Sequence, residues 1–108
     1  SLFFANASAL EEKVLSEIFS RDEISHVVLV FSAVNEVDYS ALEVLELLNN
    51  QLYEQGICLH LSEVKGPVLD KLRATEFLAH LSGYIYLTQF SAFKDIASRL
   101  GESQSVNV

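Results

Sequence analysis

The feature that most constrains the fold is the continuous apolar run at residues 26–31, which reads His-Val-Val-Leu-Val-Phe. β-Branched and aromatic residues of this kind favour strands. Because the hydrophobicity is continuous and does not alternate, the run is typical of a central strand that is covered on both faces in a parallel sheet. A polar turn follows, and a long helical pattern then begins at Asp38 or Ser40. The sequence therefore predicts an α/β protein organised around this strand and the turn that leaves it.

Three other segments repeat the order of strand and then helix. Further strands are predicted at residues 2–5, 57–61 and 84–87, and Thr88 or Ser91 is predicted to cap the last helix. Four successive βα units with right-handed crossovers form a small, largely parallel sheet that is wound with helices. The helices are predicted to run from Asn6 or Ser8 to about Phe19, from the Asp38 turn to about Gln55, from Pro67 to about Thr75 and from the Thr88 region to Gly101.

Apolar spacing assigns one face of each helix to the core. Ser8-x-x-Glu11 and Ser40-x-x-Glu43 both match the capping box of a helix start, and Gly56 suits a left-handed helix end. The expected buried faces are Leu10, Val14 and Ile18 in the first helix, Ala41, Leu45, Leu48 and Leu52 with Leu47 beside them in the second, and Phe90, Phe93 and Ile96 in the last.

Composition excludes several classes of function. The 108 residues suit one compact domain, and the net charge of −8, from 15 acidic and 7 basic residues, argues against nucleic acid as a partner. The lone Cys58 cannot form an intramolecular disulfide. His26, His60 and His80 match no metal-ligand spacing, and no GxSxG elbow is present. We therefore predict no catalytic residue, no metal and no cofactor, and hence a protein that is not an enzyme.

The chain carries no apolar segment near the ~20 residues that a membrane span needs. It contains no methionine, so we expect a domain excised from a longer polypeptide. Residues 1–101 are predicted to form the domain, and residues 102–108 a disordered tail.

Four stretches carry a family resemblance. They are residues 2–7 (Leu-Phe-Phe-Ala-Asn-Ala), the strand and turn at 27–35, the pair Asp38-x-Ser40, and residues 63–68 (Glu-Val-Lys-Gly-Pro-Val). Together they resemble STAS domains, and more narrowly the C-terminal cytoplasmic STAS domain of bacterial sulfate permease (SulP) anion transporters. The resemblance implies the anti-sigma-factor-antagonist-like fold, with a first strand before residue 2 absent from this sequence.

The resemblance also implies a function. It implies a non-enzymatic regulatory and protein-interaction domain of a transporter for sulfate, bicarbonate or dicarboxylates, at the cytoplasmic face of the bacterial inner membrane. The implied partner is the transmembrane domain of the same polypeptide. A cytosolic protein partner and a homodimer are left open, and the excised domain itself is expected to be soluble.

Ser40 is a candidate phosphorylation site. In the other branch of the family, the anti-sigma-factor antagonists, the matching serine is phosphorylated by a partner kinase, so a stand-alone phospho-switch is the alternative function. Here the motif continues Ser-Ala-Leu-Glu and lacks the glycines of that branch. The capping box with Glu43 explains the serine structurally, because such a cap stabilises a helix by roughly 0.5–2 kcal/mol.

Asn35, Asp38, Ser40, Lys65 and Gly66 are the candidate ligand or partner contacts, since both turns follow strands at the same edge of the sheet. A lysine near helix N-termini can hold a phosphate or carboxylate. No GxxxxGK[ST] or GxGxxG loop is present, so weak nucleotide binding is the third hypothesis. The aromatic residues Phe3, Phe4, Tyr84 and Tyr86 are expected in the core or on an uncovered sheet face.

Overall fold

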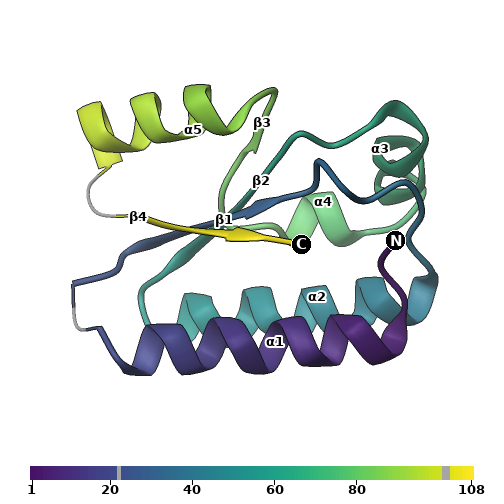
Figure 1. Ribbon diagram of the computed structural model, residues 1–108, viewed down its shortest axis with the longest axis horizontal. Helices are drawn as coiled ribbons and strands as arrows, with labels where there is room; N and C mark the ends of the chain where they lie inside the picture. The colour runs from purple at the N-terminus through teal and green to yellow at the C-terminus, as the bar shows by residue number, and fades with distance from the viewer. Residues whose placement is uncertain (22, 101–102) are drawn as a thin grey trace.

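The computed structural model describes residues 1–21, 23–100 and 103–108. A four-stranded, all-parallel sheet lies between a pair of long helices and one short helix (Figure 1). The elements are α1 (Phe4–Phe19), β1 (His26–Val30), α2 (Tyr39–Glu54), β2 (Cys58–Ser62), α3 (Gly66–Arg73), α4 (Phe77–His80), β3 (Ile85–Tyr86), α5 (Gln89–Asp95), the π-helical turn η1 (Ile96–Leu100) and β4 (Ser103–Asn107).

The strand order in the sheet is β3-β2-β1-β4, so β1 is internal. All five residues of β1 are buried. The helices α1 and α2 cover one face of the sheet and α5 covers the other, while α3 and α4 lie at one end (Figure 1). The continuous apolar run thus forms a central parallel strand, which confirms the predicted fold class.

The core has two parts because the side chains of β1 alternate between the faces of the sheet. Val27 and Leu29 belong to the larger cluster that includes the buried faces of α1 and α2. Val28 and Val30 pack with the α5 side, in a small cluster completed by Ala92 and Ile96. The apolar faces predicted for α1 and α2 are buried, except that Leu47 is exposed.

The N-terminal segment differs from its prediction as a strand. Leu2 forms only a single parallel bridge with Val37, and α1 begins at Phe4. The Asn6 side chain explains the early helix start, because its Oδ1 accepts the backbone N–H of Phe3 at 2.7 Å. The capping box at Ser8 is therefore wrong. Phe3 and Phe4 are exposed and do not belong to the core.

The C-terminal segment also differs, because residues expected to be disordered form β4. This strand runs parallel to β1, with His26 beside Ser103 and Val30 beside Asn107. Its one buried apolar side chain is that of Val106. The segment is mostly polar, so it carries no hydrophobic signal, and the unpaired backbone of β1 supplies the partner that the sequence does not reveal. The predicted helix end at Gly101 lies outside the described residues.

The last helix keeps its predicted cap, but of its predicted buried face only Ile96 is buried. Thr88 caps α5, with its Oγ1 accepting the N–H of Ser91 at 3.0 Å. Ala92 and Ile96 are the buried side chains, whereas Phe90 and Phe93 are exposed. Ala92 and Ile96 lie four residues apart and pack together on Val28 and Val30 of β1, and the larger side chains of Phe90 and Phe93 lie off that face.

Candidate functional site

The turn between β1 and α2 is held in place from several directions. Val34 and Val37 are buried anchors. The backbone N–H of Leu2 donates to the carbonyl of Glu36 at 2.8 Å, and that of Asp38 donates to the carbonyl of Leu2 at 3.2 Å. The start of the chain therefore braces the turn from one side.

Asp38 is the cap of α2. Its Oδ1 accepts the backbone N–H of Ala41 at 2.7 Å, which satisfies one of the free donors of the first turn. The capping box predicted for Ser40 and Glu43 is wrong, and Asp38, the alternative start of the helix, is the cap. Ser40 is instead the second residue of the helix, and its exposed hydroxyl has no hydrogen bond to any described residue.

Lys65 joins the two βα turns. Its Nζ donates to the carbonyl of Ser32 and, at 3.3 Å, to the carbonyl of Val34. The two turns therefore lie side by side, as the sequence predicted. Because backbone carbonyls already engage this ammonium, a ligand would have to compete with them, which weakens the hypothesis of nucleotide binding.

The remaining candidates are exposed. Asn35 lies on the turn, and Gly66 begins α3. A Cβ at Gly66 would meet nothing within 4 Å, so no close approach requires glycine there. Beside them, the Nζ of Lys71 lies 4.4 Å from the ring centroid of the exposed Tyr39. We call the exposed group Asn35, Tyr39 and Ser40 the turn surface.

A second polar group, on the α5 side of the sheet, is formed by His26 and His60, whose spacing in the sequence gives no sign that they meet. His26 Nδ1 of β1 and His60 Nε2 of the adjacent strand β2 lie 2.9 Å apart and are buried. The backbone N–H of Tyr84 donates to His60 Nδ1 at 2.9 Å. A neutral imidazole has one donor and one acceptor. His60 therefore carries its proton on Nε2 and donates it to His26 Nδ1.

This arrangement explains why the pKa of His60 is lowered. Burial, followed by repulsion from His26, lowers the pKa of His60 to about 4, against a smaller opposing attraction from Asp95. Asp95 also accepts the hydroxyl of Tyr86 at 2.6 Å, which links α5 to β3. Among the described residues, no group of three or more histidine, cysteine or carboxylate side chains is placed to hold a metal ion.

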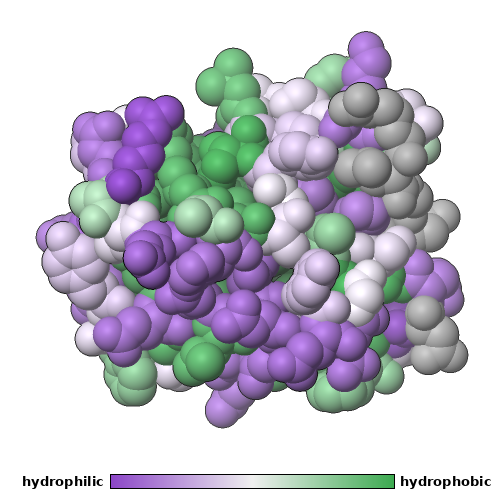
Figure 2. Space-filling model, turned by 180° about the vertical axis from the view of Figure 1, so that it is seen from behind, coloured by the Kyte–Doolittle hydropathy of each residue, from purple (hydrophilic) through white to green (hydrophobic). Residues whose placement is uncertain are grey.

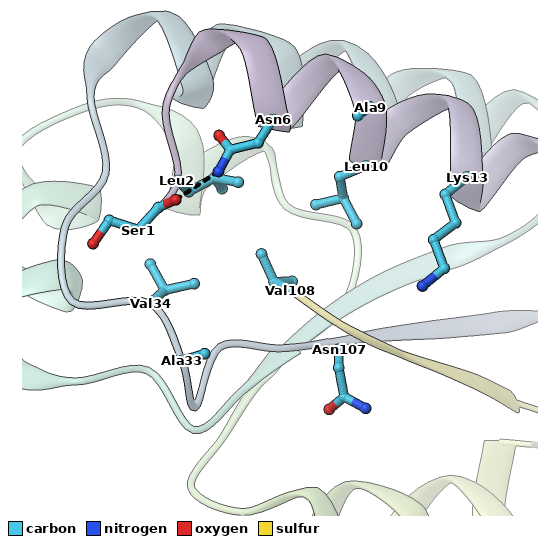
Figure 3. A pocket seen from close by; sticks show the side chains of 10 residues that line it. All are labelled: Ser1, Leu2, Asn6, Ala9, Leu10, Lys13, Ala33, Val34, Asn107 and Val108. Atoms are coloured by element: carbon cyan, nitrogen blue, oxygen red, sulfur yellow. Dashed lines mark hydrogen bonds between the residues drawn. The ribbon is translucent and has the colours of Figure 1, made fainter.

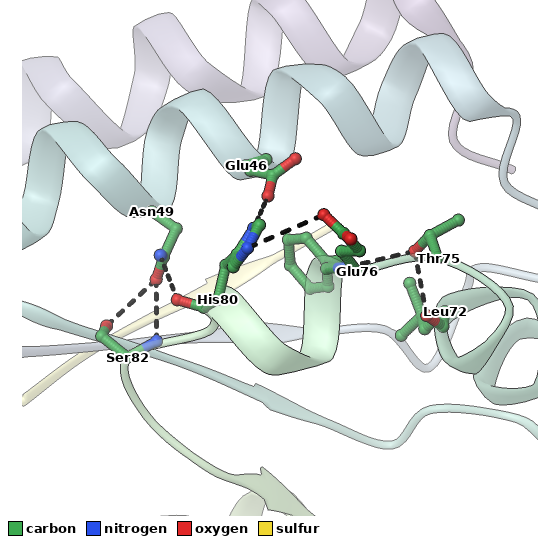
Figure 4. Close-up of polar contacts among 8 residues, drawn as sticks. Glu46, Asn49, Leu72, Thr75, Glu76, His80 and Ser82 are labelled. Carbon is green, nitrogen blue, oxygen red and sulfur yellow. Dashed lines mark hydrogen bonds and ion pairs between the residues drawn. The ribbon is translucent and has the colours of Figure 1, made fainter.

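A third polar group centres on Asn49, which is buried in α2 (Figure 4). Its Nδ2 donates to the carbonyl of His80 at 2.9 Å, and its Oδ1 accepts the N–H and the hydroxyl of Ser82, each at 3.0 Å. The hydroxyl of Ser82 accepts the N–H of Leu59 at 3.0 Å. Asn49 thus fastens the segment after α4 to α2 and β2. The signal in the sequence is an asparagine within the apolar stripe, four residues after Leu45.

His80 pairs with carboxylates on the surface of the same region (Figure 4). Its Nδ1 contacts Glu46 Oε1, and its Nε2 lies 4.0 Å from Glu76 Oε2. The hydrogen bond with Glu46 raises the pKa of His80. The contact links α4 to α2 at an exposed position.

An apolar hollow lies on the other side of the turn, between α1 and the end of β4 (Figure 3). It has a volume of about 370 Å³ and is lined by Leu2, Leu10, Val34 and Val108, with Lys13 at its rim. None of the predicted site residues lines it. The hollow and the turn surface are therefore separate features of the molecule.

Comparison with known proteins gives a family match. The family model described as "STAS domain" matches residues 1–97. No solved structure matches the chain. None of the described helices is both long and apolar enough to cross a membrane.

Two relatives from Arabidopsis thaliana illustrate the similarity. The chain is 33% identical over 98 residues to sulfate transporter 2.1, covering 81% of this chain and 14% of the relative. It is 28% identical over 98 residues to sulfate transporter 3.1, covering 81% of this chain and 15% of the relative. The chain therefore spans only a small part of these proteins. Both are plant proteins, so the bacterial source stays a prediction.

Proposed function

The chain belongs to the STAS domain family, and on that premise we propose that it is the regulatory and protein-interaction domain of a SulP-type anion transporter. Two relatives are named sulfate transporters, which makes sulfate the first anion to test. Bicarbonate and dicarboxylates are the other members of the proposed substrate class. In this proposal the transport path lies in another part of the polypeptide, and the domain acts at the cytoplasmic face of the membrane.

The observation that carries the proposal is the braced turn before α2. Asp38 and Lys65 are both satisfied by internal contacts, so they support the shape of the turn. Asn35, Tyr39 and Ser40 are exposed on this fixed backbone. Exposed polar and aromatic side chains on a hydrogen-bonded turn suit contact with another protein region, such as the transmembrane part of the transporter, better than they suit catalysis.

The test uses the whole transporter that contains this chain. Uptake of labelled sulfate and abundance at the membrane are measured for the parent protein, for a deletion of residues 1–101 and for Tyr39→Ala. We expect the deletion to abolish uptake and Tyr39→Ala to reduce it several-fold at equal abundance. Tyr53→Ala, an exposed tyrosine near the other end of α2, is the matched control and should leave uptake unchanged. Unchanged uptake and abundance in the deletion would refute the proposal.

The exposed hydroxyl of Ser40 favours a second candidate, the stand-alone phospho-switch. A phosphate on the second residue of α2 would lie at the positive end of the helix, which stabilises anions. Glu43, one turn later, would oppose it. Incubation with an anti-sigma-system kinase and ATP, followed by intact mass measurement, tests this function, with Ser40→Ala as the control. A mass without added phosphate removes this candidate.

A further inference from the structure

Strand β3 leaves backbone groups unpaired at the edge of the sheet. It pairs with β2 through Leu61 and Ile85, and the N–H of Leu61 donates to the carbonyl of Tyr84 at 3.0 Å. Successive residues of a parallel strand direct their backbone groups to alternate sides. The N–H and carbonyl of Ile85 therefore point away from β2, and within residues 1–21, 23–100 and 103–108 no loop or turn hydrogen bond engages them.

An apolar groove of about 330 Å³ lies beside this edge. Figure 2 shows hydrophobic side chains gathered in the upper half of the back face, between the α3 end and the α5 end. Leu87, just after β3, is 87% exposed, and Phe90 is 75% exposed. Contiguous apolar surface of this kind marks interaction sites. The groove, which we call the β3 groove, is lined by Val64, Leu69, Arg73, Leu78, Ile85 and Leu87.

Arg73 gives the β3 groove a charge. It lies in the last turn of α3 and is exposed. In the described part of the chain, no carboxylate lies within ion-pair distance of it. Its charge is opposite in sign to the net charge of −8 of the chain. Because a guanidinium favours bidentate pairing with a carboxylate, this side chain specifies an acidic group in the partner.

A partner that binds in the β3 groove should contact three features at once. These are the backbone of Ile85, the apolar hollow and Arg73. A helix would leave the donor and acceptor of Ile85 unpaired. A second copy of the chain would bring two acidic molecules together, which repel each other. An extended segment meets all three, because strand addition pairs the backbone while alternate side chains enter pockets.

We propose that the β3 groove binds an extended segment of a partner protein, which joins the sheet as an added strand beside β3. An apolar side chain of the segment enters the hollow between Leu69 and Leu78, and a carboxylate pairs with Arg73. This inference rests on the proposed role as an interaction domain and names the kind of partner. Because β3 has only two residues, the backbone contributes little, and the hollow and the arginine determine selectivity.

The test starts from the 108-residue chain and a displayed library of random linear peptides of about twelve residues. We expect selection of peptides that alternate apolar and polar residues and carry one acidic residue. On addition of a synthetic selected peptide, the amide signals of Ile85 and Leu87 should shift, and the Ile85 amide should become protected from hydrogen exchange. Selected peptides that bind as helices, or that leave the Ile85 amide unprotected, would overturn the proposal.

Matched variants locate the contact. Leu87→Asp should weaken peptide binding about tenfold or more, whereas Leu47→Asp, on the exposed side of α2, should leave it unchanged. Both leucines are exposed, so both variants should fold, which thermal melting verifies. Arg73→Glu should weaken binding, and a peptide with lysine in place of its acidic residue should restore it. Equal effects of the two leucine variants, or no rescue, would contradict the assigned site.

Other outcomes separate this inference from its premise. If no peptide is selected and Leu87→Asp converts a dimer into a monomer in light scattering, the groove serves self-association and the inference is wrong. If edge-binding peptides are selected but deletion of the domain leaves transport unchanged, only the proposed function fails. If the deletion abolishes transport and no peptide binds at β3, only this inference fails.

Discussion

No side chain fits at residue 83, because a Cβ on Gly83 would lie 2.3 Å from His60 Nδ1. The same atom would lie 2.4 Å from the carbonyl oxygen of Leu59, which accepts the N–H of Gly83 at 2.9 Å. The glycine therefore lets the chain pass close to β2, and it brings the N–H of Tyr84 onto the His60 ring.

Replacing this glycine should be costly. Gly83→Ala is expected to lower the free energy of unfolding by about 2–3 kcal/mol, because the backbone of Leu59 cannot move aside without disturbing β2. Urea denaturation measures the change. Gly66→Ala is the control and should be neutral or slightly stabilising, since its Cβ would meet nothing within 4 Å. Equal stability of both variants would contradict the close contact.

The lowered pKa of His60 predicts a loss of stability in mild acid. The unfolded chain binds a proton at His60 near pH 6.5, but the folded chain does so only at about pH 4. Between these values the unfolded state binds more protons, so stability falls as pH falls, by up to about 3 kcal/mol, and levels off below pH 4. Unfolding curves from pH 7.5 to 3.5 for the parent chain and His60→Gln measure this loss. The stability difference between the two should depend on pH across the window; a constant difference would refute the assignment.

The contribution of His80 to stability should depend on pH in the opposite direction. Its pKa is raised by Glu46, so its contribution is fully present below pH 6.5 and is lost as pH rises through the folded-state pKa above that value. Glu46→Gln should weaken this dependence and return the pKa of His80 towards its ordinary value. A histidine titration followed by NMR provides the measurement, and an unchanged titration of His80 in Glu46→Gln would contradict the pairing.

Asp38 and Ser40, at the start of α2, should differ in their effect on stability. Asp38→Ala should lower the free energy of unfolding by about 1 kcal/mol, because the N–H of Ala41 loses its acceptor. Ser40→Ala should change it by less than about 0.5 kcal/mol, since its hydroxyl is exposed. Thermal melts of the two variants test this order, and a larger loss for Ser40→Ala would restore the serine as the cap.

Asn49 should be the most sensitive polar residue of α2. Asn49→Ala leaves the carbonyl of His80 and the N–H of Ser82 without their partner, at a cost of about 2–3 kcal/mol. Its exposed neighbour provides the control: Asn50→Ala should alter stability by less than about 0.5 kcal/mol. Denaturant unfolding compares the two variants, and similar losses of stability would show that the hydrogen bonds of Asn49 contribute little to the stability of the fold.

The sequence predicted the elements whose signals are local. The unbroken hydrophobicity of β1 and the periodic stripe of α2 led to correct assignments, and Gly56 takes the left-handed φ of 76° expected of a helix end. The strand predicted at residues 2–5 is wrong, because its two phenylalanines favour a strand but the hydrogen bond from Phe3 to Asn6 starts the helix at Phe4.

Other features depend on strand register, which composition does not reveal. Val28 is the residue that pairs with His60, so His26 is the diagonal neighbour that reaches the ring. Likewise, an asparagine in the apolar stripe of α2 is unfavourable unless its side chain is hydrogen-bonded. The partners of Asn49 come from the segment after α4, which the local sequence does not reveal. For the candidate site, the adjacency of the two turns could be predicted from the parallel order, but the engagement of Lys65 by carbonyls could not.

The pairing of β1 with β4 also sets an order for folding during synthesis. Residues 26–30 leave the ribosome long before residues 103–107, so β1 waits with one unpaired edge until the end of this sequence has been made. During that interval its apolar strand is open to pairing with other nascent chains. Formation of β4 therefore acts as a late closing step, and mutations that delay it should reduce the yield of folded protein more than its final stability.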